Sequence, residues 1–444
     1  MKKRWLILTL CVALFAIPAT LCAAPMDAAP PQTLCAAGGT SYIIDDNHTL
    51  WACGNNSQGQ LGNGGQGNLQ QKHVTVQTTP IKIMENVASV SSSGLHTLAV
   101  GTDGVLWGWG SNRAGQLGVG VTGDGIVDGW GETYAKPVQI MTGVQAASAG
   151  EDFSLILKTD GTLWGCGIAD CLGLGNHGDV VNPYYTEIDI TGQKVDHYFQ
   201  THPVQIKTGV RAICASRNHA FAITGDDVLW GWGKNRDLSL GVGDDEEQFW
   251  TPQQIMTGVR SVSSAYSHTL AVKTDGTLWA WGRNDFGQLG NGQAQDMKQV
   301  LFAAKPVKIM DNVQTACAAG NTALYAMYPS HFSLALKTDG TLWAWGSNDY
   351  GQLGNGGASN FTAAYNKASQ YQHTLPAVNT PQKIMSGVAA ISASDFHALA
   401  RKTDGTLWAW GLNDLGPLAN DRQGNARSST DQIYQTVPAQ FQLP

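Results

Sequence analysis

The phrase DGTLWAWG at residues 275–282 decides the fold, because closely similar phrases occur seven times along the chain. The first tryptophan of each copy recurs at intervals of 49 to 66 residues, so that seven units fill residues 33–444. Periods of this size are typical of repeat proteins, in which each unit buries its apolar faces against its neighbours. We therefore expect these tryptophans to be structural: Trp51, Trp107, Trp164, Trp230, Trp279, Trp343 and Trp408.

Each unit predicts four short strands, as the fifth unit illustrates. Residues 262–265 are small, which suits a crowded strand beside an axis, and residues 268–272 alternate in the manner of a half-buried strand. Asp275 and Gly276 then form a turn into the third strand, since an Asp-Gly pair supplies the positive φ of a tight hairpin. Pro306 indicates a fourth, outermost strand. Seven such sheets predict an all-β fold, a seven-bladed β-propeller of four-stranded blades.

The repeats resemble the regulator of chromosome condensation repeat family. That family shares the elements S-A-G, H-T-L-A-L, D-G-x-L-W-x-W-G and G-Q-L-G-x-G, and the resemblance covers roughly residues 33–444. It implies a seven-bladed propeller, in which one blade is commonly assembled from both chain ends. Here the first unit begins with a first strand, and the last ends with a fourth. Every blade could therefore be continuous, which leaves the manner of ring closure open.

The first 24 residues read as a secretory signal peptide. Lys2, Lys3 and Arg4 precede an apolar run over residues 5–17, and small residues follow. The run is too short to span a bilayer, so we expect no stable membrane insertion. Residues 25–32 would be a flexible linker before the propeller at 33–444. The chain is thus expected to be an exported, bacterial-type member of the family, either periplasmic or extracellular.

Composition and charge limit the type of chain and the classes of molecule that it can bind. Hydrophobic residues make up 43% of the 444 residues, and 15 tryptophans are present, which excludes a disordered or fibrous chain. The formal net charge is −7. Because binding to nucleic acid or to anionic lipid needs a basic surface, this balance argues against both as partners. We expect a monomer that binds a protein.

The recurring polar residues predict structure rather than chemistry. Four histidines recur at one position of the repeat, and ligands at equivalent positions of separate blades would be spread around a ring, too far apart to share a zinc ion. The aspartates before glycine are turn residues. We therefore expect no metal, no cofactor and no catalytic residue. The four histidines are His96, His219, His268 and His397.

The cysteines include one candidate disulfide. Cys166 and Cys171 are close enough in sequence for a local bridge, although a bridge requires a specific geometry. Cys35, Cys214 and Cys317 occupy first-strand positions where other units have small residues, and we expect them to be buried thiols.

The segments between the third and fourth strands vary most, and they carry most of the aromatic residues outside the repeat. In a meander the first and third strands run in the same direction, so the loops that leave them share one face, opposite the Asp-Gly turns. Functional residues tend to lie on loops held by a rigid scaffold. The candidate partner-binding residues are Trp130, Tyr134, Tyr184, Tyr185, Tyr198, Phe249, Trp250, Phe361, Tyr365 and Tyr371.

These observations favour a non-catalytic scaffold that binds a protein partner through its loop face, since exposed tyrosine and tryptophan often anchor interfaces. The resemblance implies an alternative, a secreted guanine-nucleotide exchange effector that acts on a small GTPase. No exchange-factor residue can be carried over, because those residues lie in loops that do not match here. A glycan-binding lectin is a further alternative, suggested by the aromatic and amide-rich loops.

Overall fold

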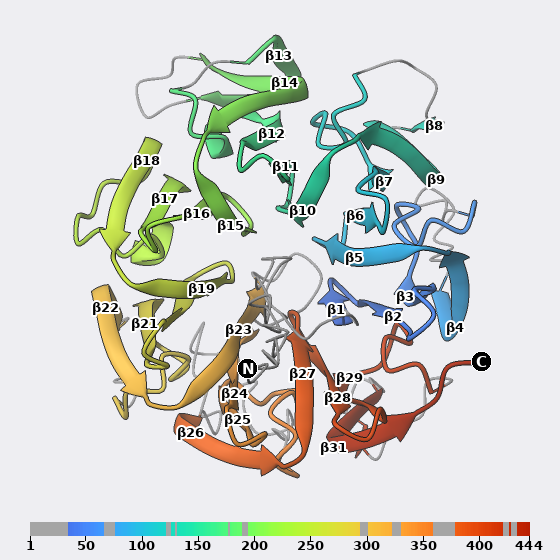
Figure 1. Cartoon of the computed structure of the whole chain (residues 1–444), viewed down its shortest axis with the longest axis vertical. Coiled ribbons are helices and arrows are strands. Elements are labelled where there is room, and N and C mark those ends of the chain that lie inside the picture. The colour runs from blue at the N-terminus through green and yellow to red at the C-terminus, as the bar shows by residue number, and fades with distance from the viewer. Residues whose placement is uncertain are drawn as a thin grey trace, which may run out of the picture.

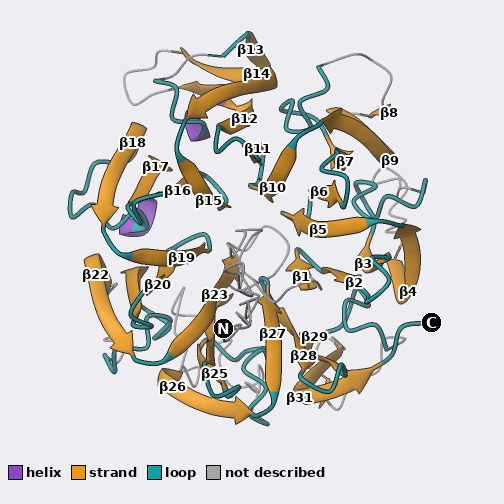
Figure 2. Ribbon diagram, in the orientation of Figure 1, coloured by secondary structure: helices purple, strands orange, loops and turns teal. Residues whose placement is uncertain are grey.

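The computed structural model describes residues 34–65, 76–120, 126–128, 131–175, 178–188, 194–293, 301–321, 330–357, 378–420, 426–427 and 433–444. Seven antiparallel sheets surround a central axis like the blades of a propeller (Figure 1). Strands and loops make up nearly all of the described chain, with two short 3-10 helices, Ala169–Cys171 and Arg236–Leu238 (Figure 2). The predicted all-β, seven-bladed propeller is confirmed. Residues 1–24 and 25–32, predicted as signal peptide and linker, lie outside the described residues.

The first three blades follow one another along the chain from the inner strand outward. Blade 1 consists of β1 (Leu34–Ala37), β2 (Thr40–Ile44), β3 (Leu50–Asn55) and β4 (Val76–Met84). Blade 2 consists of β5 (Val87–Ser92), β6 (His96–Gly101), β7 (Leu106–Ser111), β9 (Gly131–Met141) and β8 (Ile126–Asp128). Blade 3 consists of β10 (Val144–Ala149), β11 (Phe153–Lys158), β12 (Leu163–Ile168), β14 (Lys194–Lys207) and β13 (Val180–Ile188).

The remaining blades repeat this order. Blade 4 holds β15 (Val210–Ala215), β16 (His219–Thr224), β17 (Leu229–Lys234) and β18 (Gln248–Met256), and blade 5 holds β19 (Val259–Ser264), β20 (His268–Lys273), β21 (Leu278–Arg283) and β22 (Phe302–Met310). Blade 6 holds β23 (Val313–Asn321), β24 (Ser330–Lys337), β25 (Leu342–Gly346) and β26 (Val378–Met385). Blade 7 holds β27 (Val388–Ala393), β28 (His397–Lys402), β29 (Leu407–Leu412), β31 (Ile433–Phe441) and β30 (Ala426–Arg427).

Three blades therefore have five strands rather than the predicted four. The additional strands β8, β13 and β30 come from the variable segments, and each pairs antiparallel with the outer strand of its own blade. The four-stranded meander is nevertheless present in all seven blades.

The Asp-Gly turn forms for a local reason. Gly276 has φ +80°, and a side chain there would be strained by its backbone conformation. Asp275 Oδ1 accepts a hydrogen bond from the Thr277 amide at 2.9 Å. The first tryptophan of the phrase, Trp279, donates from Nε1 to Thr277 Oγ1 at 2.9 Å and lies under the Lys273 ammonium, 5.7 Å from the ring centroid. It is half-buried at the edge of the core rather than inside it.

The second tryptophan joins successive blades. It is fully buried, and its Nε1 donates to a main-chain carbonyl in the Gly-Gln-Leu-Gly segment of the preceding blade, or in the segment equivalent to it. Trp345, for example, donates to Gln288 O at 2.8 Å. Burying such a ring removes about 150–250 Å² from water, which makes it a major part of each blade interface. The same contact recurs for Trp109, Trp232, Trp281 and Trp410. In blades 1 and 3 a buried thiol takes its place: Cys53 Sγ contacts Pro417 O, and Cys166 Sγ contacts Gln116 O.

Ring closure uses the same bonds as the other blade junctions. The Ala149 amide of blade 3 donates to Ser91 Oγ of blade 2 at 3.0 Å, and the Ala36 amide of blade 1 donates to Ser392 Oγ of blade 7, also at 3.0 Å. β1 thus lies beside β27 (Figure 1). Every blade is continuous in sequence, and side chain to main chain hydrogen bonds close the ring without a shared sheet.

Candidate functional site

The two faces of the ring differ as the strand directions predict. At one face the loop after the third strand bonds to the loop after the first, as where the Arg283 amide donates to Ser267 O at 2.9 Å. At the other face the Asp-Gly turns bond to the next blade, as where the Val313 amide donates to Gly276 O at 2.9 Å. We call these the loop face and the turn face. The insertion of blade 6, which leaves β23 at Asn321 and returns at Ser330, begins and ends on the loop face.

In six of the seven blades, an asparagine after the third strand fixes the loop face. In blade 4, Asn235 Oδ1 accepts from the Leu240 amide at 3.1 Å, while its Nδ2 donates to Asp244 O and Glu246 O. The Oδ1 contact recurs at Asn56, Asn112, Asn284, Asn348 and Asn413. The sequence analysis missed these residues. Their signal was an asparagine recurring five positions before the leucine of Gly-x-Leu-Gly.

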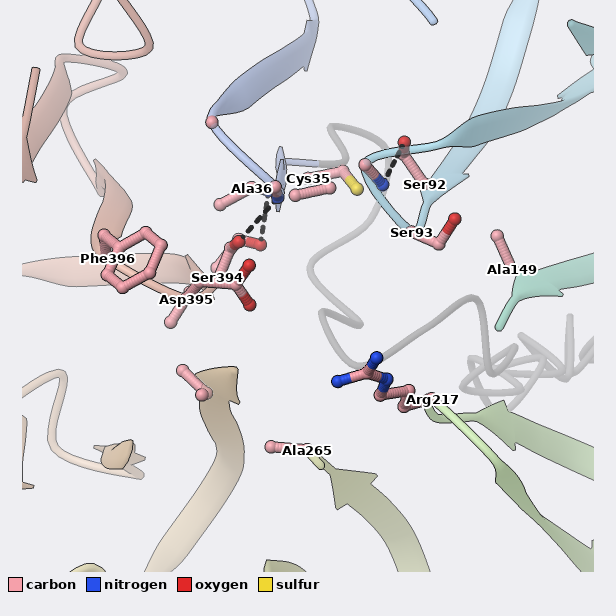
Figure 3. Close-up of a pocket in the computed structure, with 18 of the residues that line it drawn as sticks. Cys35, Ala36, Ser92, Ser93, Ala149, Arg217, Ala265, Ser394, Asp395 and Phe396 are labelled. Atoms are coloured by element: carbon pink, nitrogen blue, oxygen red, sulfur yellow. Dashed lines mark hydrogen bonds between the residues drawn. The ribbon is translucent and has the colours of Figure 1, made fainter. Parts of the chain in front are cut away.

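A cavity of about 290 Å³ opens on the axis, lined mainly by the inner strands and the turns that follow them. Figure 3 shows the Arg217 side chain extending from blade 4 into this space, with Ser394 and Asp395 of blade 7 across from it. Arg217 Nε forms an ion pair with Glu151, and its guanidinium lies 4.9 Å from the Tyr266 ring centroid. Burial raises the pKa of Glu151, while the Arg217 charge opposes that shift. The cavity is a recess on the loop face that holds the charged groups of Arg217 and Glu151.

The recurring histidines are structural. Ser154 Oγ donates to Gln116 O at 2.6 Å and lies 2.9 Å from His96 Nε2, so the imidazole donates to the serine of the next blade. Burial lowers the pKa of His96, His219 and His268 to about 3 and that of His397 to about 4, and all four are neutral near pH 7. His331, which the sequence analysis did not single out, behaves in the same way. Within the described ranges, no group of three or more candidate ligands could hold a metal ion.

The candidate local disulfide is not present. Cys166 and Cys171 are both free and buried, and they are directed to different blades. Cys166 Sγ contacts the Gln116 carbonyl of blade 2 at 3.4 Å, whereas Cys171 Sγ contacts the Asn218 carbonyl of blade 4 at 3.2 Å. Burial raises the pKa of Cys166 to about 12, so this thiol is unreactive.

The structure separates the candidate aromatic residues. Trp130, Phe361, Tyr365 and Tyr371 lie outside the described residues, and Tyr184 and Tyr185 lie within β13. Tyr134 donates from its hydroxyl to Glu132 Oε1 at 3.1 Å, and Tyr198 is half-buried in β14. Phe249 packs against the core between blades 4 and 5. Trp250 differs from these residues, with 39% of its surface exposed.

Trp250 occupies a position where the other six blades have small or short polar residues. The Gly175 amide of blade 3 donates to Trp250 O at 3.1 Å. In other blades, a glycine amide of the preceding blade donates in the same way to the carbonyl oxygen of Ala135, Thr201, Asn379 or Thr436. By register, Thr78 and Ala304 take this place in blades 1 and 5. The backbone at this position thus holds the ring together, and the indole is not required for that purpose.

Two further features of blades 4 and 5 lie near the loop-face ends of their outer strands. The preceding loop carries four consecutive exposed acidic residues, 244–247. On blade 5, Phe302 begins β22 opposite Arg283 and is 43% exposed. The candidates of the sequence analysis did not include Phe302, because its exposure depends on packing that the sequence does not display.

Comparison with known proteins identifies the family. The RCC1-like domain model matches residues 18–356, and the regulator of chromosome condensation (RCC1) repeat model matches residues 339–401. The chain belongs to the RCC1-like domain family. A second RCC1 repeat model matches residues 388–416, so the matches extend from the N-terminal region into blade 7.

The relatives of this RCC1-like chain are eukaryotic proteins of distant identity. It is 27% identical over 223 residues to the guanine nucleotide exchange factor SRM1 of Saccharomyces cerevisiae, spanning 49% of this chain and 44% of that protein. It is also 27% identical to the secretion-regulating guanine nucleotide exchange factor of Bos taurus, spanning 85% of this chain and 77% of that protein. The chain thus spans less than half the length of the yeast relative.

Solved structures show the same fold. Yeast RCC1 (Prp20) bound to Kap60 superposes with a TM-score of 0.65 at 18% identity, covering 96% of this chain and 85% of that one. Human WBSCR16 superposes with a TM-score of 0.63 at 19% identity, covering 89% of this chain and 95% of that one. Separately, no helix within the described ranges has the length and hydropathy needed to cross a bilayer.

Proposed function

We propose that this RCC1-like propeller is a non-catalytic scaffold that binds a protein partner through its loop face. The observation that carries the proposal is Trp250, an exposed indole at a position where the other blades have small or short polar residues. An exposed tryptophan held on a rigid strand is a typical anchor of protein interfaces, because it offers a large contact area at little entropic expense. The recess around Arg217 and Glu151 lies on the same face.

We further propose that the chain is exported, as a bacterial-type member of the family, and works in the periplasm or outside the cell. This rests on the basic start and apolar run of residues 1–24. Expression of the full chain with fractionation of cytoplasm, periplasm and medium tests it. Recovery of an unprocessed chain in the cytoplasm would overturn it.

The binding proposal is tested with the mature chain as bait for proteins of the cell envelope and culture medium. Trp250→Ala should weaken capture of a specific partner by at least about tenfold, as expected for a hot-spot tryptophan. Val437→Ala is the matched control, since Val437 is 40% exposed within the outer strand of blade 7. Both variants should keep the wild-type unfolding midpoint, because exposed substitutions change stability by about 0.5 kcal/mol or less. Equal capture by both variants would show that the wrong surface was chosen.

A second candidate function is nucleotide exchange on a small GTPase. It is favoured by the match to two proteins named as guanine nucleotide exchange factors, one of which this chain matches over 85% of its length. Release of a fluorescent guanine nucleotide from a panel of small GTPases tests it. Acceleration by catalytic amounts of the chain would favour exchange over simple binding, whereas binding without acceleration would favour the scaffold.

A further inference from the structure

Two apolar side chains lie exposed at the loop-face ends of neighbouring outer strands. Phe249, adjacent to Trp250, pairs with Gly233 at the end of β17, and Phe302 pairs with Arg283 at the end of β21. Within the described part of the chain, Trp250 and Phe302 are the only two exposed large aromatics. We call these two residues the aromatic pair. An exposed apolar surface of this kind on a rigid scaffold marks an interaction site.

The loop that precedes Trp250 carries negative charge, and its main chain is fixed in place. The acidic run 244–247 is held by its main chain: Asn235 Nδ2 donates to Asp244 O at 2.9 Å and to Glu246 O at 3.0 Å, and the Asn235 amide donates to Glu247 O at 2.7 Å. The four side chains are exposed. No lysine or arginine of the described residues forms an ion pair with any of them.

Several carboxylates elsewhere on the ring form ion pairs. On the turn face, Lys82 pairs with Glu85 at 2.5 Å and Lys308 with Asp311 at 2.7 Å. On the inner part of the loop face, the same holds for Arg113 with Asp152, Arg217 with Glu151 and Arg283 with Asp285. The rim of blade 4 thus combines an exposed indole with four exposed carboxylates, none of which forms an ion pair within the described residues.

We propose that the aromatic pair docks a basic segment of the protein partner, in which lysine or arginine side chains stack on Trp250 and face the acidic run 244–247. This deepens the proposed function and rests on it. Both halves of the contact are favourable, because cations are attracted to the face of an indole and to nearby carboxylates. The chain itself contains such cation–π contacts: Lys207 Nζ lies 4.3 Å from the Trp230 ring centroid, and Lys402 Nζ lies 4.5 Å from that of Trp408.

The test uses three fluorescently labelled synthetic peptides of equal length, in which leucine alternates with arginine, with glutamine or with glutamate. Their affinities for the mature chain are measured by fluorescence anisotropy. We expect the arginine peptide to bind and the other two to bind at least about tenfold more weakly, with affinity falling as salt rises, since charges are screened beyond about 10 Å at 0.1 M salt. Equal binding of all three, or no binding of the arginine peptide up to about 1 mM, would overturn the proposal.

Two double variants with the same net charge separate a defined site from general attraction. Asp245→Asn with Glu247→Gln removes two exposed carboxylates of the acidic run on the loop face. Glu85→Gln with Asp311→Asn removes two exposed carboxylates of the turn face. The loop-face double variant should lower the affinity for the arginine peptide about tenfold, as should Trp250→Ala. The turn-face double variant should change that affinity less than about twofold. Equal effects of the two double variants would contradict the assignment.

The two proposals fail in different ways. If a captured protein partner is lost with Trp250→Ala but retained when residues 245 and 247 are neutralised, the loop face binds a partner that is not basic. In that outcome the proposed function stands and the inference is wrong. If Trp250→Ala also leaves capture unchanged, the proposed function fails with it.

Discussion

The indole nitrogen of Trp410 in blade 7 donates a 2.8 Å hydrogen bond to the main-chain carbonyl of Gln352 in blade 6. This pairing is the unit from which the ring is built, because it couples a fully buried ring in one blade to the loop of the blade before it. It also explains why the phrase and the Gly-Gln-Leu-Gly segment recur together in the sequence.

Trp410→Phe should therefore lower the free energy of unfolding by about 1–3 kcal/mol, since it leaves a buried carbonyl without its donor. Trp410→Ala should cost about 3–5 kcal/mol through the cavity that it creates. Urea unfolding followed by far-ultraviolet circular dichroism measures both values. Trp408→Phe is the control, because Trp408 is half-buried and its partner, Thr406 Oγ1, can bind water instead. Equal losses for the two phenylalanine variants would contradict this account.

The junction between blades 7 and 1 should be as strong as the internal ones. Ser392→Ala removes the acceptor of the Ala36 amide, and Ser91→Ala removes the equivalent acceptor of Ala149. Each variant should lose about 0.5–1.5 kcal/mol of unfolding free energy, the net value of one hydrogen bond. Chemical denaturation of the two variants side by side checks this. A much smaller loss for Ser392→Ala would show that the ring opens at that junction before it unfolds.

Acid should destabilise the propeller through its buried histidines. Burial lowers the pKa of His96 from 6.5 to about 3, so the unfolded chain binds a proton there more readily than the folded one. The stabilisation is complete above pH 6.5 and is lost as the pH falls toward 3, by about 1.4 kcal/mol per pH unit for each histidine. His96→Asn should reduce the dependence of the unfolding free energy on pH between 6 and 5. An unchanged dependence would indicate that this imidazole is already protonated when folded.

The thiols Cys166 and Cys171 should remain reduced and protected. Alkylation of the native chain should leave both unmodified, whereas alkylation after denaturation without reductant should modify both, because no bridge joins them. Mass spectrometry of the peptides gives the result. The unfolding midpoint should likewise not change with reductant. A pair that resists alkylation until reduced would show that the bridge does form in the protein.

The sequence predicted the fold because its signals were local and repeated seven times. Asp275, Gly276 and Thr277 define a turn through contacts within three residues, and every copy of the phrase reports the same turn independently. The added strands β8, β13 and β30 could not be predicted. Each lies in a variable segment, outside the repeated phrase, and pairs only with the open edge of the outer strand of its blade. Alternate residues of a strand share a face, so the phrase could not show that Trp279 lies at the edge of the core and Trp281 under the loop of the preceding blade.

The candidate site was predicted less well, because exposure depends on neighbours from other blades. Phe249 and Trp250 are adjacent in sequence, yet one packs into the core between blades 4 and 5 while the other is exposed. Aligning the repeats one position further would have distinguished Trp250 from the other candidates, since Ala135 and Thr201 occupy the equivalent place. No comparable signal predicts the recess around Arg217, which is assembled from the inner strands around the axis.

The continuity of each blade bears on how such a chain can change over evolution. A blade that is encoded by one uninterrupted stretch can be duplicated or deleted as a single genetic segment without leaving an orphaned strand. Because the Ser392 to Ala36 contact repeats the one between Ser91 and Ala149, an added blade would meet compatible neighbours on both sides. A ring sealed by a strand shared between its two ends would lack that freedom, since altering either end would break the shared sheet.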